Sequence, residues 1–262
     1  GEGLAEISLG LQGSLQGLLS YLSNPPINMR EEIELPEDGL EGAAEINVNV
    51  TFPTVKDLRD EDVDVVATGT LSNVLLPNMI RGLPLKDGPY TVEASRTDFR
   101  IRGSGALGAS PITLDWHQIL EKEAAQTAGY GQKVQAELMT SPPLLEAFEL
   151  SPVSQYVAAS FPLSLTYRED FEISADDFAD LSLSADLERV LVELDMFGYT
   201  KEAGDPGRLE LQGRIQDKNL TRIDKLDITG AGIDIRGADL FLRPDIILPI
   251  QGTIPTFQIG QT

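Results

Sequence analysis

The chain has 262 residues, of which 41% are hydrophobic, and this apolar content suffices for a continuous core, so a disordered protein is excluded. Its 42 acidic and 20 basic residues give a net charge of −22, which excludes nucleic-acid binding and broad docking on an anionic membrane because phosphate groups would be repelled. Cysteine is absent, which excludes disulfide bonds, thiolate metal sites and cysteine nucleophiles.

Alternation of apolar and polar residues dominates the first half of the chain. It predicts strands, because successive side chains of a strand point to opposite faces of a sheet. The predicted strands lie at residues 3–11, 46–52, 65–71, 92–94, 99–101 and 112–116. Turn signals rich in glycine, at 86–89 and 103–105, separate some of them. Such spacing favours an antiparallel sheet with short connections.

The second half continues the same pattern. Its predicted strands lie at residues 134–138, 163–167, 181–187, 209–211, 223–228 and 233–235. Glycine-containing turns at 204–207 and 230–232 again lie between strands.

Helical signals are few and short. Four of them, at 14–23, 72–81, 142–148 and 186–197, each follow a predicted strand, and the segment 117–127 has the best helix propensity. A unit of one strand and one or two helical turns therefore recurs along the chain. Two copies keep a common register of 116 residues, which relates Asp64 to Asp180, Leu71 to Leu187, Val74 to Val190 and Gly82 to Gly198.

Repetition predicts an elongated body, because a unit that cannot bury its own apolar face must stack on its neighbours. The predicted fold class is mainly β: an elongated, curved antiparallel β-sheet groove with short helices between strands. We expect residues 1–262 to form one continuous segment of a larger protein, with repeat-like halves at about 1–128 and 129–262. No stretch has the roughly 20 apolar residues of a membrane span.

His117 is the sole histidine, and Asp115 would share its strand face and could orient the imidazole. No G-x-S-x-G elbow accompanies them, so we interpret His117 as a structural or surface residue and predict no catalytic residue. Gly103, Gly105 and Gly108 match the letters of a dinucleotide fingerprint, but a strand follows them where a helix is required, which favours a glycine-rich hairpin turn. No metal site and no cofactor are predicted.

The apolar strand face is then the candidate working surface. It is rich in aliphatic residues and poor in aromatic ones, which suits the closed core of a β-sandwich and equally an open sheet that receives acyl chains. The predicted lining of such a surface is Ile46, Val48, Val50, Phe52, Val92, Phe99, Ile101, Ile112, Leu114, Trp116, Leu163, Leu165, Tyr167, Leu209, Leu211, Ile233 and Ile235.

The order of several motifs resembles the central region of AsmA-like proteins, and most closely their YhdP-type branch, which is related to TamB. The motifs are L-G-L-Q-G-S-L at 9–15, N-P-P-I at 24–27, G-L-E-G-A-A at 39–44, L-K-D-G-P-Y at 85–90, F-R-I-R-G at 99–103, I-T-L-D-W at 112–116 and L-S-L-T-Y-R-E-D-F at 163–171. The first aromatic step departs from the family pattern, because His117 follows Trp116 where an acidic residue and a phenylalanine are expected.

This resemblance implies a non-enzymatic, bridge-like lipid transfer protein. The expected role is to conduct phospholipid between the inner and outer membranes of a Gram-negative bacterium and so to maintain the lipids of the outer membrane. The expected location is the periplasm, as part of a protein anchored in the inner membrane. The expected partners are phospholipid acyl chains and membrane proteins at the two ends of the full-length chain. The alternative is a closed structural or adhesive β-sandwich without lipid transport.

Overall fold

The computed structural model describes residues 3–22, 39–59, 62–147, 160–171, 178–194, 198–216, 219–243 and 246–259. With 69% strand and 9% helix, the protein is mainly β. Twelve pairs of neighbouring strands, from β1 with β2 to β15 with β16, are antiparallel. The predicted mainly antiparallel fold with few short helices is therefore confirmed.

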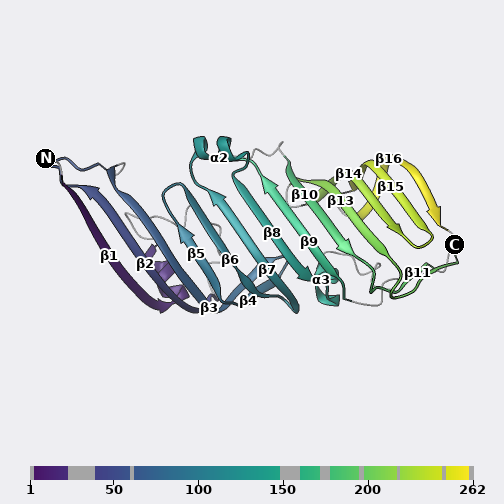
Figure 1. The fold of residues 1–262 in the computed structure, drawn as a ribbon, viewed down its shortest axis with the longest axis horizontal. Coiled ribbons are helices and arrows are strands. Elements are labelled where there is room, and N and C mark those ends of the chain that lie inside the picture. The colour runs from purple at the N-terminus through teal and green to yellow at the C-terminus, as the bar shows by residue number, and fades with distance from the viewer. Residues whose placement is uncertain are drawn as a thin grey trace. The chain divides into compact units, whose positions relative to one another are not determined.

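Figure 1 shows the elements in the order in which they follow one another along the chain. The described helices are α1 (Leu15–Leu22), α2 (Lys122–Ala128) and α3 (Pro142–Ala147). The described strands are β1 (Leu4–Ser14), β2 (Glu41–Pro53), β3 (Asp64–Ile80), β4 (Leu83–Asp87), β5 (Tyr90–Ala94), β6 (Asp98–Leu107), β7 (Ser110–Ile119), β8 (Gln132–Met139), β9 (Pro162–Glu169), β10 (Ala179–Asp186), β11 (Val192–Leu194), β12 (Tyr199–Lys201), β13 (Gly207–Gln216), β14 (Asn219–Gly230), β15 (Ile233–Arg243) and β16 (Ile246–Ile259).

Fourteen of these strands belong to one sheet, in the order β1-β2-β3-β4-β6-β7-β8-β9-β10-β13-β14-β15-β16, with β5 pairing to both β3 and β6. Strands β11 and β12 form a separate two-stranded sheet. The order in the large sheet follows the order in the sequence, as expected when short turns connect antiparallel neighbours.

The described strands thus do not divide into two large sheets of the kind that pack face to face in a sandwich. Contacts divide the chain into two compact units, one made of Gly1–Gly108 with Thr113–Gln132 and the other of Ala109–Ile112 with Lys133–Thr262.

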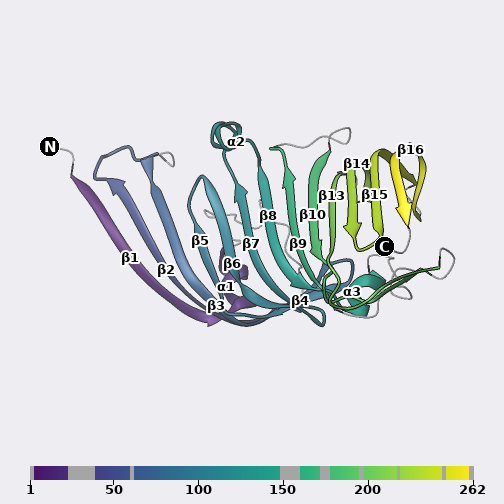
Figure 2. The same cartoon turned by 45° about the vertical axis from the view of Figure 1, so that its right-hand side comes forward.

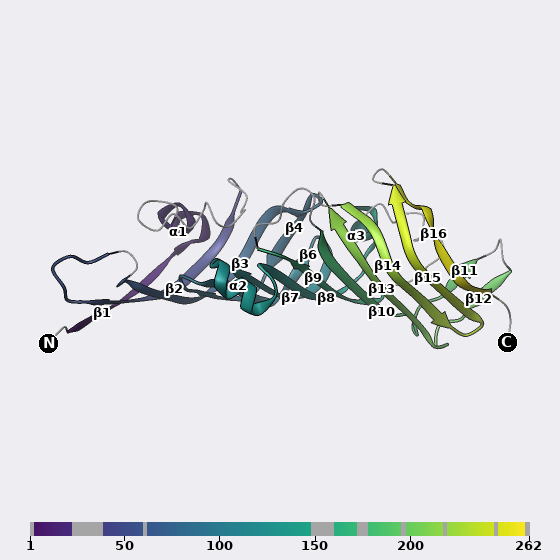
Figure 3. The same cartoon turned by 90° about the horizontal axis from the view of Figure 1, so that it is seen from above.

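The first unit contains β1 to β6, most of β7, and helices α1 and α2. Its strands bend along their length, most visibly β1 to β3 (Figure 2). Helix α1 packs against β1 and β2 (Figure 3). Leu15 of α1 and Ala44 and Ile46 of β2 are buried, so the helix and this end of the strands contribute to one apolar core.

Tyr90 is the most deeply buried aromatic residue of the first unit, with 1% of its surface exposed. Its hydroxyl donates a hydrogen bond to the carbonyl of Lys86 at 3.1 Å. A Cβ atom added to Gly105 would lie 2.0 Å from the Tyr90 hydroxyl oxygen, and one on Gly103 would lie 2.7 Å from a carbon of the ring. The two glycines are therefore needed where the tyrosine ring crosses β6.

The second unit contains β8 to β16 and α3. Ile223, Leu240 and Leu242 form a buried cluster in β14 and β15, packed against partly buried leucines of β13 and β14. Lys201 of β12 is 2% exposed, and its ammonium donates hydrogen bonds to the carbonyls of Glu188, Val190 and Glu202. A buried ammonium requires such partners because desolvation without them is costly.

Two of the five predicted helices are wrong. Residues 72–80 continue strand β3, and Arg81 lies in the turn after it. Residues 186–197 contain the end of β10 and strand β11, with 195–197 outside the described residues. Two features explain why residues 72–80 form a strand instead of a helix. Pro77 has no backbone N–H to donate inside a helix, and the segment pairs with β4, where Leu76 lies opposite Leu85. The helix predicted at 117–127 begins later, at Lys122, because β7 continues through Ile119.

The 116-residue register has structural counterparts at two of its pairs. Val74 and Val190 are both buried, at 3% and 0% exposure. Gly82 and Gly198 both have positive φ, at 81° and 59°, and each stands immediately before a strand, β4 and β12 respectively. A left-handed backbone favours glycine at both positions. The predicted helical turns within this repeat are nevertheless absent from the described residues.

Candidate functional site

Strand register gathers the predicted apolar residues of the first unit on one face of the sheet. Residues directly opposite each other on paired strands share a face. Three of the four predicted residues of β2 have apolar or glycine partners on both sides: Ile46 lies between Leu11 and Gly69, Val48 between Leu9 and Ala67, and Val50 between Ile7 and Val65. The fourth, Phe52, pairs with Ala5 of β1.

The same face continues through β5 to β7. Val92 pairs with Gly69 on one side and with Ile101 on the other, and Ala94 pairs with Phe99. The rings of Phe99 and Trp116 meet edge to face, with centroids 5.9 Å apart. Along β7, Ile112 and Leu114 alternate in phase with Trp116.

The predicted residues of the second unit also share one face. Leu163, Leu165 and Tyr167 of β9 lie opposite Ala185, Leu183 and Leu181 of β10. On the other side of β10, Ala185 and Leu183 pair with Leu209 and Leu211 of β13. Leu209 pairs with Ile228, which pairs with Ile235, and Ile233 lies two residues before Ile235 on β15. The structure thus brings the predicted lining residues together within each unit.

These residues differ in exposure. Five of them are buried: Ile46, Phe99, Ile101, Ile112 and Trp116. The remaining twelve are partly exposed: Val48, Val50, Phe52, Val92, Leu114, Leu163, Leu165, Tyr167, Leu209, Leu211, Ile233 and Ile235. A fully closed sandwich core would bury most such positions. The apolar face therefore retains accessible aliphatic surface in both units.

Sequence reasoning missed several residues of this face. Ile7 and Leu9 are 46% and 50% exposed, and Phe257, which pairs with Ile235, is 53% exposed. Val65, Ala67, Leu181 and Leu183 lie on the same face. Alternation at residues 5–11, 65–71 and 181–187 shows which residues of each strand are apolar. Assigning them to the same face as their neighbours requires the register between strands.

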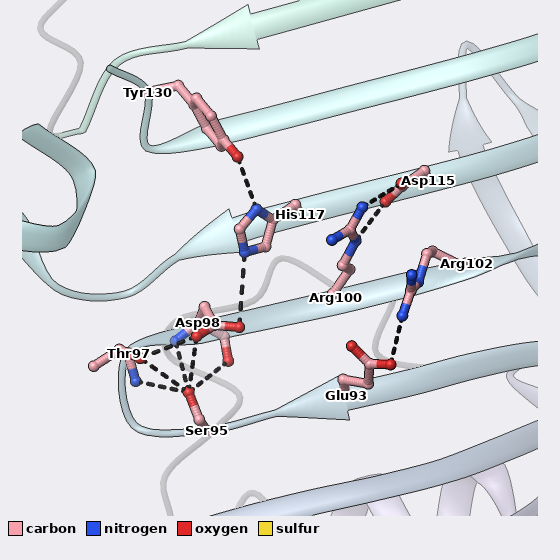
Figure 4. Close-up of polar contacts among 9 residues, drawn as sticks. All are labelled: Glu93, Ser95, Thr97, Asp98, Arg100, Arg102, Asp115, His117 and Tyr130. Atoms are coloured by element: carbon pink, nitrogen blue, oxygen red, sulfur yellow. Dashed lines mark hydrogen bonds and ion pairs between the residues drawn. The ribbon is translucent and has the colours of Figure 1, made fainter. Parts of the chain in front are cut away.

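The opposite face is polar and carries cross-strand ion pairs. In the second unit these join Arg168 to Asp180 at 3.0 Å and Arg214 to Asp224 at 2.9 Å, and Arg222 also contacts Asp224. In the first unit Arg100 binds Asp115, with Nε and Oδ1 2.8 Å apart, and Arg102 binds Glu93 (Figure 4). The hydrogen bond from Arg100 lowers the pKa of Asp115 below its ordinary value.

Figure 4 shows the surroundings of His117 on this polar face. Its Nδ1 lies 2.9 Å from the Tyr130 hydroxyl, and its Nε2 lies 3.7 Å from Asp98 Oδ1. Asp115, the partner predicted for His117, instead forms its hydrogen bonds with Arg100. The nearby Ser95 hydroxyl bonds to the Asp98 carboxylate.

An open pocket of about 270 Å³ adjoins the imidazole and is lined by Glu93, Thr97, Asp98, Arg100, His117, Ile119 and Ala124. The two ring nitrogens of His117 face Tyr130 and Asp98, and Ser95 bonds to Asp98, whereas a Ser-His-Asp triad requires a serine bonded to the imidazole itself.

The glycine motif has a packing role instead of the predicted hairpin turn. Gly103 and Gly105 lie inside β6 beneath Tyr90, and only Gly108 stands in the turn that leads to β7. The strand predicted after it, at 112–116, is present as part of β7. Among the described residues, no group of three or more His, Asp or Glu side chains is placed to hold a metal ion.

Comparison with known proteins identifies no match: no family model, no curated protein and no solved structure is similar to the chain. None of the described helices is long and apolar enough to span a membrane.

Proposed function

We propose that this chain is a lipid-conducting segment whose apolar sheet face carries the acyl chains of phospholipids. The proposal includes the AsmA-like, YhdP-type assignment, transfer between inner and outer membranes, and a periplasmic location. The observation that supports it best is the set of partly exposed aliphatic residues that share one face within each unit, from Val48 and Val50 to Leu165 and Leu211.

Acyl chains fit this surface chemically. They have no polar group to pair, and burying apolar area is worth about 25 cal/mol per Å², so a half-exposed valine or leucine gains about 1 kcal/mol when a chain covers it. Many small gains of this kind would hold a lipid without a specific pocket and would let it slide. Head groups would stay in water, since the apolar face offers few polar partners.

The net charge of −22 bears on which lipids bind. Anionic head groups would be repelled by an acidic surface, whereas zwitterionic ones would not. We therefore expect zwitterionic phospholipids to load more readily at low salt, with the difference shrinking as salt screens the charges.

Native mass spectrometry of the purified protein, combined with lipid extraction, tests the proposal. We expect co-purified phospholipid, and we expect Val50→Asp to lose it while Asn49→Asp, one residue away on the polar face, retains it. An absence of lipid from the wild-type protein, with a closed form in solution scattering, would favour the structural or adhesive module.

A further inference from the structure

The sole histidine of the chain and Asp98 face each other on the polar face of the first unit. Nε2 of His117 lies 3.7 Å from Oδ1 of Asp98. A hydrogen bond between such atoms is shorter, at about 2.7–3.2 Å. A tetrahedral zinc ion holds nitrogen and carboxylate oxygen ligands at about 2.0–2.2 Å, which places two of them about 3.3–3.6 Å apart. The observed distance is therefore close to that between two ligands of one metal ion.

The imidazole of His117 is oriented for a ligand at Nε2. Its Nδ1 lies 2.9 Å from the Tyr130 hydroxyl oxygen (Figure 4). With the ring proton on Nδ1, this oxygen accepts it, and the lone pair of Nε2 is directed at Asp98. Metal-bound histidines usually donate their second ring nitrogen in this way, because the hydrogen bond fixes the tautomer and the ring. The two rings also meet edge to face, with centroids 5.8 Å apart.

The carboxylate of Asp98 is held through its other oxygen. Oδ2 accepts hydrogen bonds from the hydroxyls of Ser95 and Thr97, each at 3.0 Å. The backbone N–H of Asp98 in turn donates to the Ser95 hydroxyl oxygen at 3.1 Å. Hydrogen bonds of this kind orient a ligating carboxylate. They leave Oδ1 turned toward the imidazole, on a side chain that is 43% exposed and so accessible to ions.

The surrounding charges favour a cation at this point. Glu93 is paired with Arg102, and Asp115 is paired with Arg100. Each of these arginines is matched by a carboxylate, so Asp98 adds a further negative charge beside the imidazole. His117 and Asp98 both line the open pocket of about 270 Å³. A water molecule occupies about 30 Å³ of liquid, so the pocket has room for a hydrated ion.

From this geometry we infer that His117 and Asp98 bind one divalent transition-metal cation, with zinc as the best fit. Imidazole nitrogen suits zinc, copper and nickel, whereas calcium and magnesium take oxygen ligands. Water from the pocket completes the coordination. Two protein ligands are fewer than the four of a structural zinc site, so the cation exchanges readily. The site lies on the polar face and does not depend on the proposed binding of lipid to the apolar face.

Zinc chloride is the probe, added to the purified protein at about pH 7.5 because a ligating imidazole must be unprotonated. Heteronuclear NMR follows the ring signals of His117, and every histidine signal reports on this site because the chain has one histidine. Physiological salt screens the general attraction of cations to a net charge of −22. We expect a saturable change that fits one zinc ion per chain. Calcium at the same concentrations should leave the signals unchanged.

Four variants test the assignment of the ligands. Asp98→Asn keeps the histidine signals and should weaken zinc binding about tenfold or more. Tyr130→Phe removes the partner of Nδ1 and should weaken binding about tenfold, as the loss of an outer-shell partner does. His117→Ala, followed by titration calorimetry, should lose the site. Glu123→Gln is the matched control, because it removes an exposed carboxylate beside Ala124 of the same pocket and should bind zinc as the wild type does.

Thermal denaturation shows which variants are folded, and the wild-type titration decides the proposal even if one of them is not. Histidine signals that zinc leaves unchanged would overturn it. Equal zinc affinity of Asp98→Asn and Glu123→Gln would also overturn it, because the binding would then belong to the acidic surface in general. The same change on addition of calcium would lead to the same conclusion.

Discussion

The structure predicts that Gly105→Ala destabilises the protein, and the contacts of the added methyl carbon set the size of the effect. The added methyl carbon would lie 2.0 Å from the Tyr90 hydroxyl oxygen and 2.3 Å from the carbonyl oxygen of Lys86. The second contact is with backbone, so a change of rotamer cannot relieve it. Overpacking of this kind costs about 1–3 kcal/mol, and the lost Tyr90 hydrogen bond adds about 1 kcal/mol. We expect the free energy of unfolding to fall by about 2–4 kcal/mol.

Gly13→Ala is the matched control, because Gly13 also lies in a strand and an added Cβ would meet nothing within 4 Å. It should change stability by less than about 1 kcal/mol, and a small gain is expected from the less flexible unfolded chain. Urea denaturation with both midpoint and slope measured gives the comparison. If the two variants are equally stable, Tyr90 does not pack over β6 as described. If Tyr90→Val restores part of the stability that Gly105→Ala removes, the loss comes from the clash with the tyrosine ring.

Three further predictions concern single side chains. Lys201→Met should lower the free energy of unfolding by about 1–3 kcal/mol, because it removes the ammonium donor from three carbonyls, of which, among the described residues, those of Glu188 and Glu202 keep a backbone N–H donor and that of Val190 does not. An equally stable variant in thermal denaturation would contradict this. The pKa of Asp115 is lowered in the folded state, so its pairing with Arg100 stabilises the protein at pH values above the ordinary pKa of 3.8. This stabilisation is lost as the pH falls through the lowered pKa. Arg100→Gln should remove this part of the acid dependence, measured by denaturation between neutral pH and about pH 2. Burial raises the pKa of Tyr90 to about 12, so Tyr90→Phe should remove a late step from the ultraviolet pH titration and leave the steps of exposed tyrosines unchanged.

Alternation in the sequence predicted most strands, because a half-buried strand requires it whatever its neighbours. Helices were harder to place. The segment at 72–81 has apolar residues at helical spacing, such as Leu75 and Met79. Pairing with β4 nevertheless decides its structure, and Asn73 and Asn78 adopt the positive φ angles of an irregular strand. Pro77 is the one residue of the segment that argues against a helix, because proline has no backbone N–H to donate.

The apolar face could be predicted only in part. Parity within β2, β6 and β9 identified residues such as Val48, Ile101 and Leu165, but it could not show that Ile7 and Leu183 join them, since that depends on register between distant strands. The partner of His117 was missed for a similar reason. Asp98 reaches the imidazole from the start of the neighbouring strand, whereas Asp115 is hydrogen-bonded to Arg100.

Photocrosslinking in cells tests the central claim most directly. A photoreactive residue at Val48 or Leu165 samples the apolar face, and one at Asn49 or Thr166 samples the polar face one residue away. The account predicts that phospholipid is captured at Val48 and Leu165 and not at Asn49 or Thr166. Equal capture at all four positions, or capture at none of them while the protein is folded, would contradict a lipid-carrying apolar face.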